Sequence, residues 1–156
     1  MTAAILGHDV WVAVCDGRKA LLFQNTGDHV YPKLELRDHQ EHPNPRTSDQ
    51  GSSPPGRTIS SADGRHSAVS QTDFHDESER AFLKDFAHAL DKHVRDAHIH
   101  KLVLVAPARA LGMIRPALSP ATQKVIHREF DRDYVKLPAH EIEQHLSKLG
   151  RDDGVK

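Results

Sequence analysis

VWVAVC at residues 10–15 and KLVLVAPA at residues 101–108 decide the fold. Each is a continuous apolar run of strand-forming residues, which indicates a strand buried on both faces of a sheet. The clearest helical pattern of the chain, residues 73–97, lies between them, with apolar residues four apart from Phe82 to Val94. A helix between two buried strands implies a right-handed crossover, so these strands are expected to be parallel.

Two further strands are predicted directly after the first one. Asp16–Gly17 predicts a hairpin turn, because glycine tolerates a positive φ, and residues 18–25 then form the returning strand. VYPKLEL at residues 30–36 alternates between apolar and polar residues, and Pro32 favours an edge position. The first 37 residues therefore predict a three-stranded meander with its first strand innermost.

The segment after residue 108 predicts three helices and one more strand. A short helix ends near Pro116, and a second one starts at residues 119–120, where serine caps and proline opens it. DYVKL at 133–137 predicts a short strand, and residues 138–150 a closing helix that Gly150 ends. The predicted fold is α/β, a mixed five-stranded sheet in the order 3-2-1-4-5 with helices packed on it. This is the ribonuclease-H-like pattern, which serves many unrelated functions.

A long polar segment, residues 38–73, separates the third strand from the predicted helix. It contains four aliphatic residues against seven serines, four prolines and three glycines. Structureless loops of this length are uncommon inside compact domains and are usually functional or disordered. We predict a single domain over residues 1–150 with this segment as a mobile loop, and a polar tail at residues 151–156.

Charge and apolar content exclude several classes of function. The formal net charge is -1, so no global basic field attracts nucleic acid. Residues 109–136 are modestly basic, with six Lys or Arg against three acids, which suits a phosphate surface or simply a solvated face. No stretch approaches the ~18 apolar residues that a transmembrane helix needs, and the N-terminus shows no leader. We predict a cytoplasmic protein without membrane insertion.

The common catalytic motifs are not found. Thirteen histidines include the pairs His39–His42 and His98–His100, but these lie in different segments without paired cysteines or an HExxH motif. A two-metal nuclease would need an acid within the first strand, and residues 10–15 contain none. Cys15, the single cysteine, is expected to be buried and inert. No metal and no cofactor are predicted.

Five polar residues are the candidate binding site, because ligands of open α/β sheets bind near the carboxyl ends of the strands. Asp16 and Arg18 belong to the first turn, Arg65 and His66 to the polar segment, and Arg109 follows the fourth strand. Each also has a plain structural alternative. Asp16 would shape the turn, Arg65 would cap a carbonyl, and Arg109 would pair with a carboxylate.

Three segments resemble the bacterial host attachment protein family, described as required for attachment to host cells. They are residues 10–23, residues 64–90 and residues 101–146. The third is the most specific, with its Pro–Ala–Arg, Leu–Gly, Leu–Ser–Pro and Leu–Pro–Ala–His–Glu sequences. The resemblance covers most of the chain except parts of residues 38–63. That family is similar in fold to the middle domain of eukaryotic and archaeal peptide-chain release factors.

The resemblance implies a comparison for the long polar segment. In release factors, the loop before the main helix carries a Gly-Gly-Gln tip that enters the peptidyl-transferase centre. Residues 38–73 occupy the matching place but contain no Gly-Gly-Gln, so no catalytic role passes to Gln50 or Gln71. The first hypothesis is a non-enzymatic binding module with a ribosomal, RNA or protein partner and an indirect role in attachment. The alternative is a hydrolase of an ester such as peptidyl-tRNA, with His66 as catalytic base. A scaffold with a disordered loop is the third. The oligomeric state is not predicted.

Overall fold

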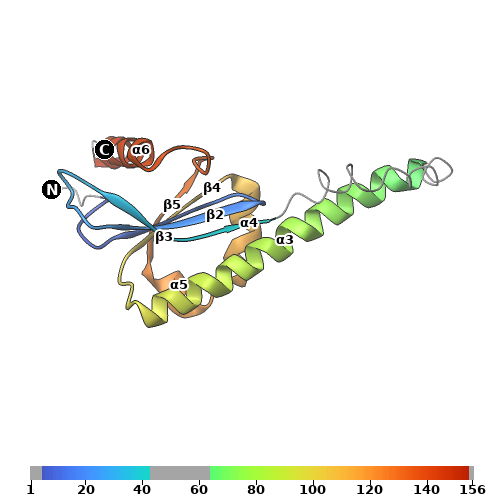
Figure 1. The fold of residues 1–156 in the computed structure, drawn as a ribbon, viewed down its shortest axis with the longest axis horizontal. Helices are drawn as coiled ribbons and strands as arrows, with labels where there is room; N and C mark the ends of the chain where they lie inside the picture. Colours follow the sequence, from blue (N-terminus) through green and yellow to red (C-terminus); the bar gives the residue numbers. More distant parts are fainter. Residues whose placement is uncertain (1–4, 43–63, 155–156) are drawn as a thin grey trace.

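The computed structural model describes residues 5–42 and 64–154, and within them a mixed five-stranded sheet (Figure 1). The strand order is β3-β2-β1-β4-β5, as predicted. β1 pairs antiparallel with β2 and parallel with β4, which confirms the crossover inferred from the two apolar runs. The strands are β1 (Trp11–Cys15), β2 (Lys19–Asn25), β3 (Leu34–Glu41), β4 (Leu102–Ala106) and β5 (Ile126–Asp131).

Helices cover both faces of the sheet. α3, α4 and α5 lie on one face and α6 lies on the other (Figure 1). A short 3-10 helix, η1, follows α4. The bounds are α3 (Gly64–Asp96), α4 (Ala108–Ile114), η1 (Arg115–Ala117), α5 (Pro120–Val125) and α6 (Ala139–Gly154). The two-residue period of β1 distributes its side chains between two cores, with Ala13 and Cys15 on the α3 face and Val12 and Val14 on the α6 face.

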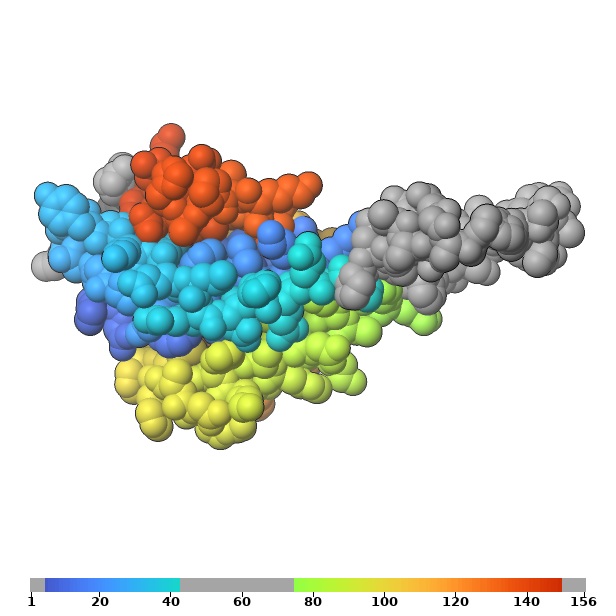
Figure 2. Space-filling view, in the orientation of Figure 1, coloured from blue at the N-terminus to red at the C-terminus, as the bar shows by residue number. Residues whose placement is uncertain are grey.

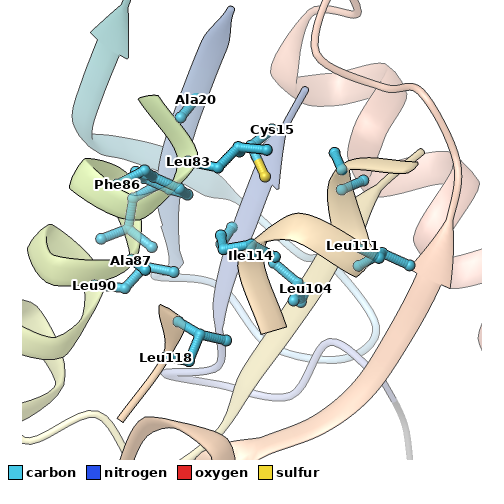
Figure 3. Close-up of a cluster of buried hydrophobic side chains, with 14 of the residues drawn as sticks. Cys15, Ala20, Leu83, Phe86, Ala87, Leu90, Leu104, Leu111, Ile114 and Leu118 are labelled. Atoms are coloured by element: carbon cyan, nitrogen blue, oxygen red, sulfur yellow. The ribbon is translucent and has the colours of Figure 1, made fainter. Parts of the chain in front are cut away.

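The larger core lies between the sheet and α3 with α4. Phe86 and Leu83 of α3 are almost wholly buried there and pack beside Cys15 and Ile114 (Figure 3). Full burial of such side chains contributes roughly 1.5–3 kcal/mol each. The helical stripe predicted from Phe82 to Val94 is therefore the face that fixes α3 on the sheet.

The edge strands were predicted less accurately than the central ones. β3 is an edge strand as expected and lies exposed between α6 and α3 (Figure 2), but it begins at Leu34 instead of residue 30. The prediction for residues 30–33 was wrong because a turn closes there: the Asp28 carboxylate accepts hydrogen bonds from the backbone N–H groups of Val30 and Tyr31, at 2.9 and 2.8 Å.

The C-terminal elements also differ from the prediction. The helix that starts at Pro120 ends at Val125, and the chain enters β5 at once, because Ile126–Asp131 pair with β4. The predicted strand at 133–137 is wrong, since the Leu137 N–H donates to the Tyr134 carbonyl in a turn. α6 continues past Gly150 to Gly154, which is tolerated because an interior glycine costs a helix only about 1 kcal/mol.

The predicted loop 38–73 was wrong at both ends. Residues 38–41 belong to β3, and α3 begins at Gly64, before the expected helix start at residue 73. Between these ends, residues 43–63 lie outside the described residues. No helix in the described part of the chain is both long and apolar enough to cross a membrane.

Candidate functional site at the base of a projecting helix

The first part of α3 projects beyond the sheet (Figure 1). We call residues 64–75 the arm. α3 has 33 residues and is therefore about 50 Å long at 1.5 Å per residue. The arm contains glycine, serine and threonine, which are weak helix formers. It extends a helix whose remainder is already packed, and adding residues to an existing helix is far easier than nucleating one.

Three separate connections hold α3 where the arm leaves the sheet. They are the turn between β1 and β2, the residue after β3, and the first turn of α4. All three reach the helix between Asp76 and Phe82. We call this junction the arm base; its residues are Gly17, His42, Asp76, Ser78, Glu79 and Arg109. The carboxyl ends of β1 and β4 meet here, which is the edge of the sheet where the sequence placed the candidate site.

The β1–β2 turn is built by Asp16. Its carboxylate accepts hydrogen bonds from the backbone N–H groups of Arg18 and Lys19, both at 2.8 Å. The structural alternative for Asp16 is thus confirmed. The expected reason for Gly17 was wrong, because no glycine among the described residues has a positive φ. Gly17 instead leaves room for α3: a Cβ there would lie 2.6 Å from Cδ of Glu79.

Arg109 connects α4 to α3. Its Nη2 donates to Oδ1 of Asp76, and its Nε lies 3.6 Å from Oε1 of Glu79. The structural alternative for Arg109, pairing with a carboxylate, is therefore confirmed. The Arg109 side chain is 60% exposed, so solvent weakens both ion pairs. Their effect is directional, because one guanidinium holds two successive turns of α3.

His42 joins the end of the edge strand to the same helical segment. Its Nε2 lies 2.7 Å from Oγ of Ser78, and its ring packs against Phe82 with 5.9 Å between the centroids. The His42 N–H also donates to the Arg18 carbonyl at 2.7 Å, so the β1–β2 turn and the β3 end are tied together. A second histidine contact, His93 to Asp38 at 2.9 Å, connects α3 to β3 further along.

The structure brings together only part of the predicted site. Asp16, Arg18 and Arg109 lie at or beside the arm base. Arg65 and His66 were expected in a loop, but they belong to the first turn of α3, at the far end of the arm. Along the helix they lie roughly 15 Å from Asp76. The five candidates therefore form a base and a tip.

Asp76, Glu79, His42 and Ser78 were missed as site residues. The helical pattern predicted from residue 73 places the two acids near a helix start, whereas a helix that begins at Gly64 places them in its interior. Their signal in the sequence was a three-residue spacing that puts both carboxylates on one helix face. Their partner Arg109 lies 33 residues from Asp76, which only the fold reveals.

The contacts at the arm base hold the position of α3. Burial raises the pKa of the nearby Cys15 thiol to about 12, so this cysteine stays protonated and unreactive. Among the side chains that the structure describes, in residues 5–42 and 75–149, no three His, Cys, Asp or Glu gather as a metal site would need. What the base does is set the direction in which the arm leaves the domain.

Comparison with known proteins now places the chain. Residues 9–146 match the family described as bacterial archaeo-eukaryotic release factor family 12, a span that includes all five strands, the arm and its base. The chain belongs to this family. At a coarse level, membership in family 12 makes it a release-factor-like, translation-related module. It also supports the release-factor part of the resemblance seen in the sequence.

Other comparisons of the family 12 chain add little. No curated protein matches the sequence. One solved structure, the Aquifex aeolicus Ppx/GppA phosphatase in its type II variant, aligns with 78% of this chain and 34% of its own at 12% identity and a TM-score of 0.28.

Proposed function

We propose that this family 12 protein is a non-enzymatic binding module that uses its arm to contact the ribosome or a ribosome-bound RNA. The observation that carries the proposal is a projecting helix, clamped at its base, in a chain that belongs to a release-factor family. The arm begins with Arg65 and His66, which makes its tip a candidate for phosphate contact. Because ribosomes lie in the cytoplasm, the protein would act there.

The clamp at the base supports this role on energetic grounds. A binding element that is already ordered loses less conformational freedom when it binds than a flexible one does. Arg109, Glu79 and His42 restrict the orientation of α3 before any partner arrives. The arm is therefore presented to a partner in a set direction.

The two other hypotheses from the sequence carry less support. A hydrolase with His66 as catalytic base has no structural feature in its favour, since His66 lies in the first turn of α3, away from the residues of the arm base. An indirect role in host attachment, exerted through translation from the cytoplasm, is compatible with the proposal and rests on the sequence resemblance alone.

Gradient sedimentation of cell lysate tests the proposal. Full-length tagged protein is followed through free and ribosomal fractions at low and at raised salt. We expect co-migration with ribosomes that salt weakens, as contacts to phosphate require. The paired change Arg65→Ala with His66→Ala should abolish co-migration without lowering the melting temperature. Arg132→Ala, at an exposed position directly after β5, should change neither. Migration with free protein, or unchanged binding by the tip variant, would overturn the proposal.

A further inference from the structure

A pocket of about 640 Å³ lies at the opposite end of α3 from the arm. Its walls are the last turns of α3, the connection to β4, and α5, which Figure 1 shows beside the end of α3. Volumes of this size are typical of small-molecule sites. The floor is apolar, formed by Val94, Ile99, Ala121 and Val125.

The backbone that ends α3 builds one wall of this pocket. The Ile99 N–H donates to the Val94 carbonyl at 3.2 Å, and His98 between them has a φ of 53°. This is the arrangement of a Schellman ending, in which a residue in left-handed conformation folds the next apolar residue back onto the helix. Glycine is the usual residue there, so the histidine is held in a conformation that L residues disfavour. His98 is one of the residues that line the pocket.

The rim of the pocket carries two cations, Arg95 and Lys124, and two histidines. Arg95, Lys124, His98 and His100 line it and are all exposed. Arg95 has one ion pair, at 3.5 Å, with its exposed neighbour Asp96, a kind of pair that contributes little. Among the residues whose side chains are described, no acid forms an ion pair with Lys124.

The acid in the lining, Asp91, forms hydrogen bonds within the fold. Oδ1 of Asp91 accepts hydrogen bonds from Thr122 Oγ1 at 2.5 Å, from Ser119 Oγ at 3.0 Å and from the Ser119 N–H at 3.2 Å. These bonds hold the start of α5 against α3 and satisfy Oδ1 of the Asp91 carboxylate. An entering ligand meets the exposed Arg95 and Lys124 beside an apolar floor.

We propose that this pocket binds a small amphiphilic anion, a molecule with an apolar body and one carboxylate or phosphate group. The apolar body would lie on Val94, Ile99 and Val125, and the anionic group would face Arg95 and Lys124. A neutral apolar ligand would leave the cations unpaired, and a purely hydrophilic anion would leave the floor exposed. The inference does not depend on the proposed ribosomal function.

Titration of the isotope-labelled full-length protein, followed by its amide resonances, tests the site. The probes are decanoate and decyl phosphate, with decanol as the neutral counterpart. We expect saturable shifts confined to residues 91–100 and 119–126 for at least one anion, and at least tenfold weaker binding of decanol. The double variant Arg95→Glu with Lys124→Glu should weaken anion binding at least tenfold.

The control variant is Arg37→Glu with Arg132→Glu, which changes the net charge equally at exposed positions on β3 and after β5. Its affinity should stay within twofold of the native chain. Shifts scattered over the molecule, no saturable binding of either anion, equal binding of decanol, or an unchanged affinity in the Arg95 and Lys124 variant would each overturn the inference.

Discussion

Replacing Arg109 by methionine removes the guanidinium from the arm base and keeps most of the side-chain stem. Two ion pairs are lost, to Asp76 and to Glu79. The exposed fractions of the side chains are 60% for Arg109, 39% for Asp76 and 28% for Glu79. Exposed pairs contribute about 0.2–1 kcal/mol each, so we expect the free energy of unfolding to fall by about 1 kcal/mol. For a chain of this size the melting temperature then falls by about 3 °C.

The effect on the arm should be local. If Arg109 fixes the direction of α3, amide hydrogen exchange in Arg109→Met should accelerate about fivefold in α3 around residues 76–82, because about 1 kcal/mol of local stability is lost. Exchange in β1 and β4 should not change beyond the global effect. A matched control is Arg132→Met, whose described contacts are with the adjacent Asp131. Equal acceleration in the strands and the helix, or no acceleration near residue 79, would refute the reasoning.

Four further outcomes follow from other features of the structure. Gly17→Ala should displace Glu79 and cost about 0.2–1 kcal/mol, and by urea denaturation it should add nothing to Glu79→Ala; fully additive costs would contradict the close approach. His98→Gly should raise the stability by about 1 kcal/mol, because it relieves a positive φ, yet weaken binding of decanoate or decyl phosphate; lower stability would argue against strain. Burial, then Lys101 and Arg128, lowers the pKa of His127 below 6.5, so its stabilising effect is complete above about pH 6.5 and is lost as the pH falls through the lowered value. His127→Gln should reduce this acid sensitivity in unfolding midpoints, and an unchanged pH dependence would exclude the histidine as its source. Cys15 should resist thiol reagents in the native state at neutral pH, and labelling before unfolding would contradict its burial.

The centre of the fold could be predicted because its strands are buried on both faces. Residues 11–15 and 102–106 are continuous apolar runs, and the helix between them repeats every four residues, so sheet order and crossover followed. The edges could not. β5 reads IHREFD, with no apolar run and no clean alternation, and is a strand because it pairs with β4. Asp28 makes residues 30–33 a turn although their alternation is typical of a strand.

The candidate site was half visible in the sequence. Asp16 and Arg109 were found because strand ends can be read from apolar runs. Their partners were not, because the contacts of Arg109 with Asp76 and of Gly17 with Glu79 depend on how α3 lies across the sheet. The arm was missed because its sequence lacks the apolar repeat that indicates a packed helix, and because its first residues favour turns. The start of α3 follows from continuation of the packed part of the helix.

Cross-linking from the arm itself tests the central claim most directly. A photoreactive residue is placed at Ser67 in the arm, or at the exposed Gln144 of α6 on the opposite face of the sheet, in full-length protein within growing cells. The account predicts that the arm position cross-links to ribosomal RNA or to a ribosomal protein and that the α6 position does not. Ribosomal cross-links from α6 alone, or arm cross-links only to components of the cell envelope, would contradict it.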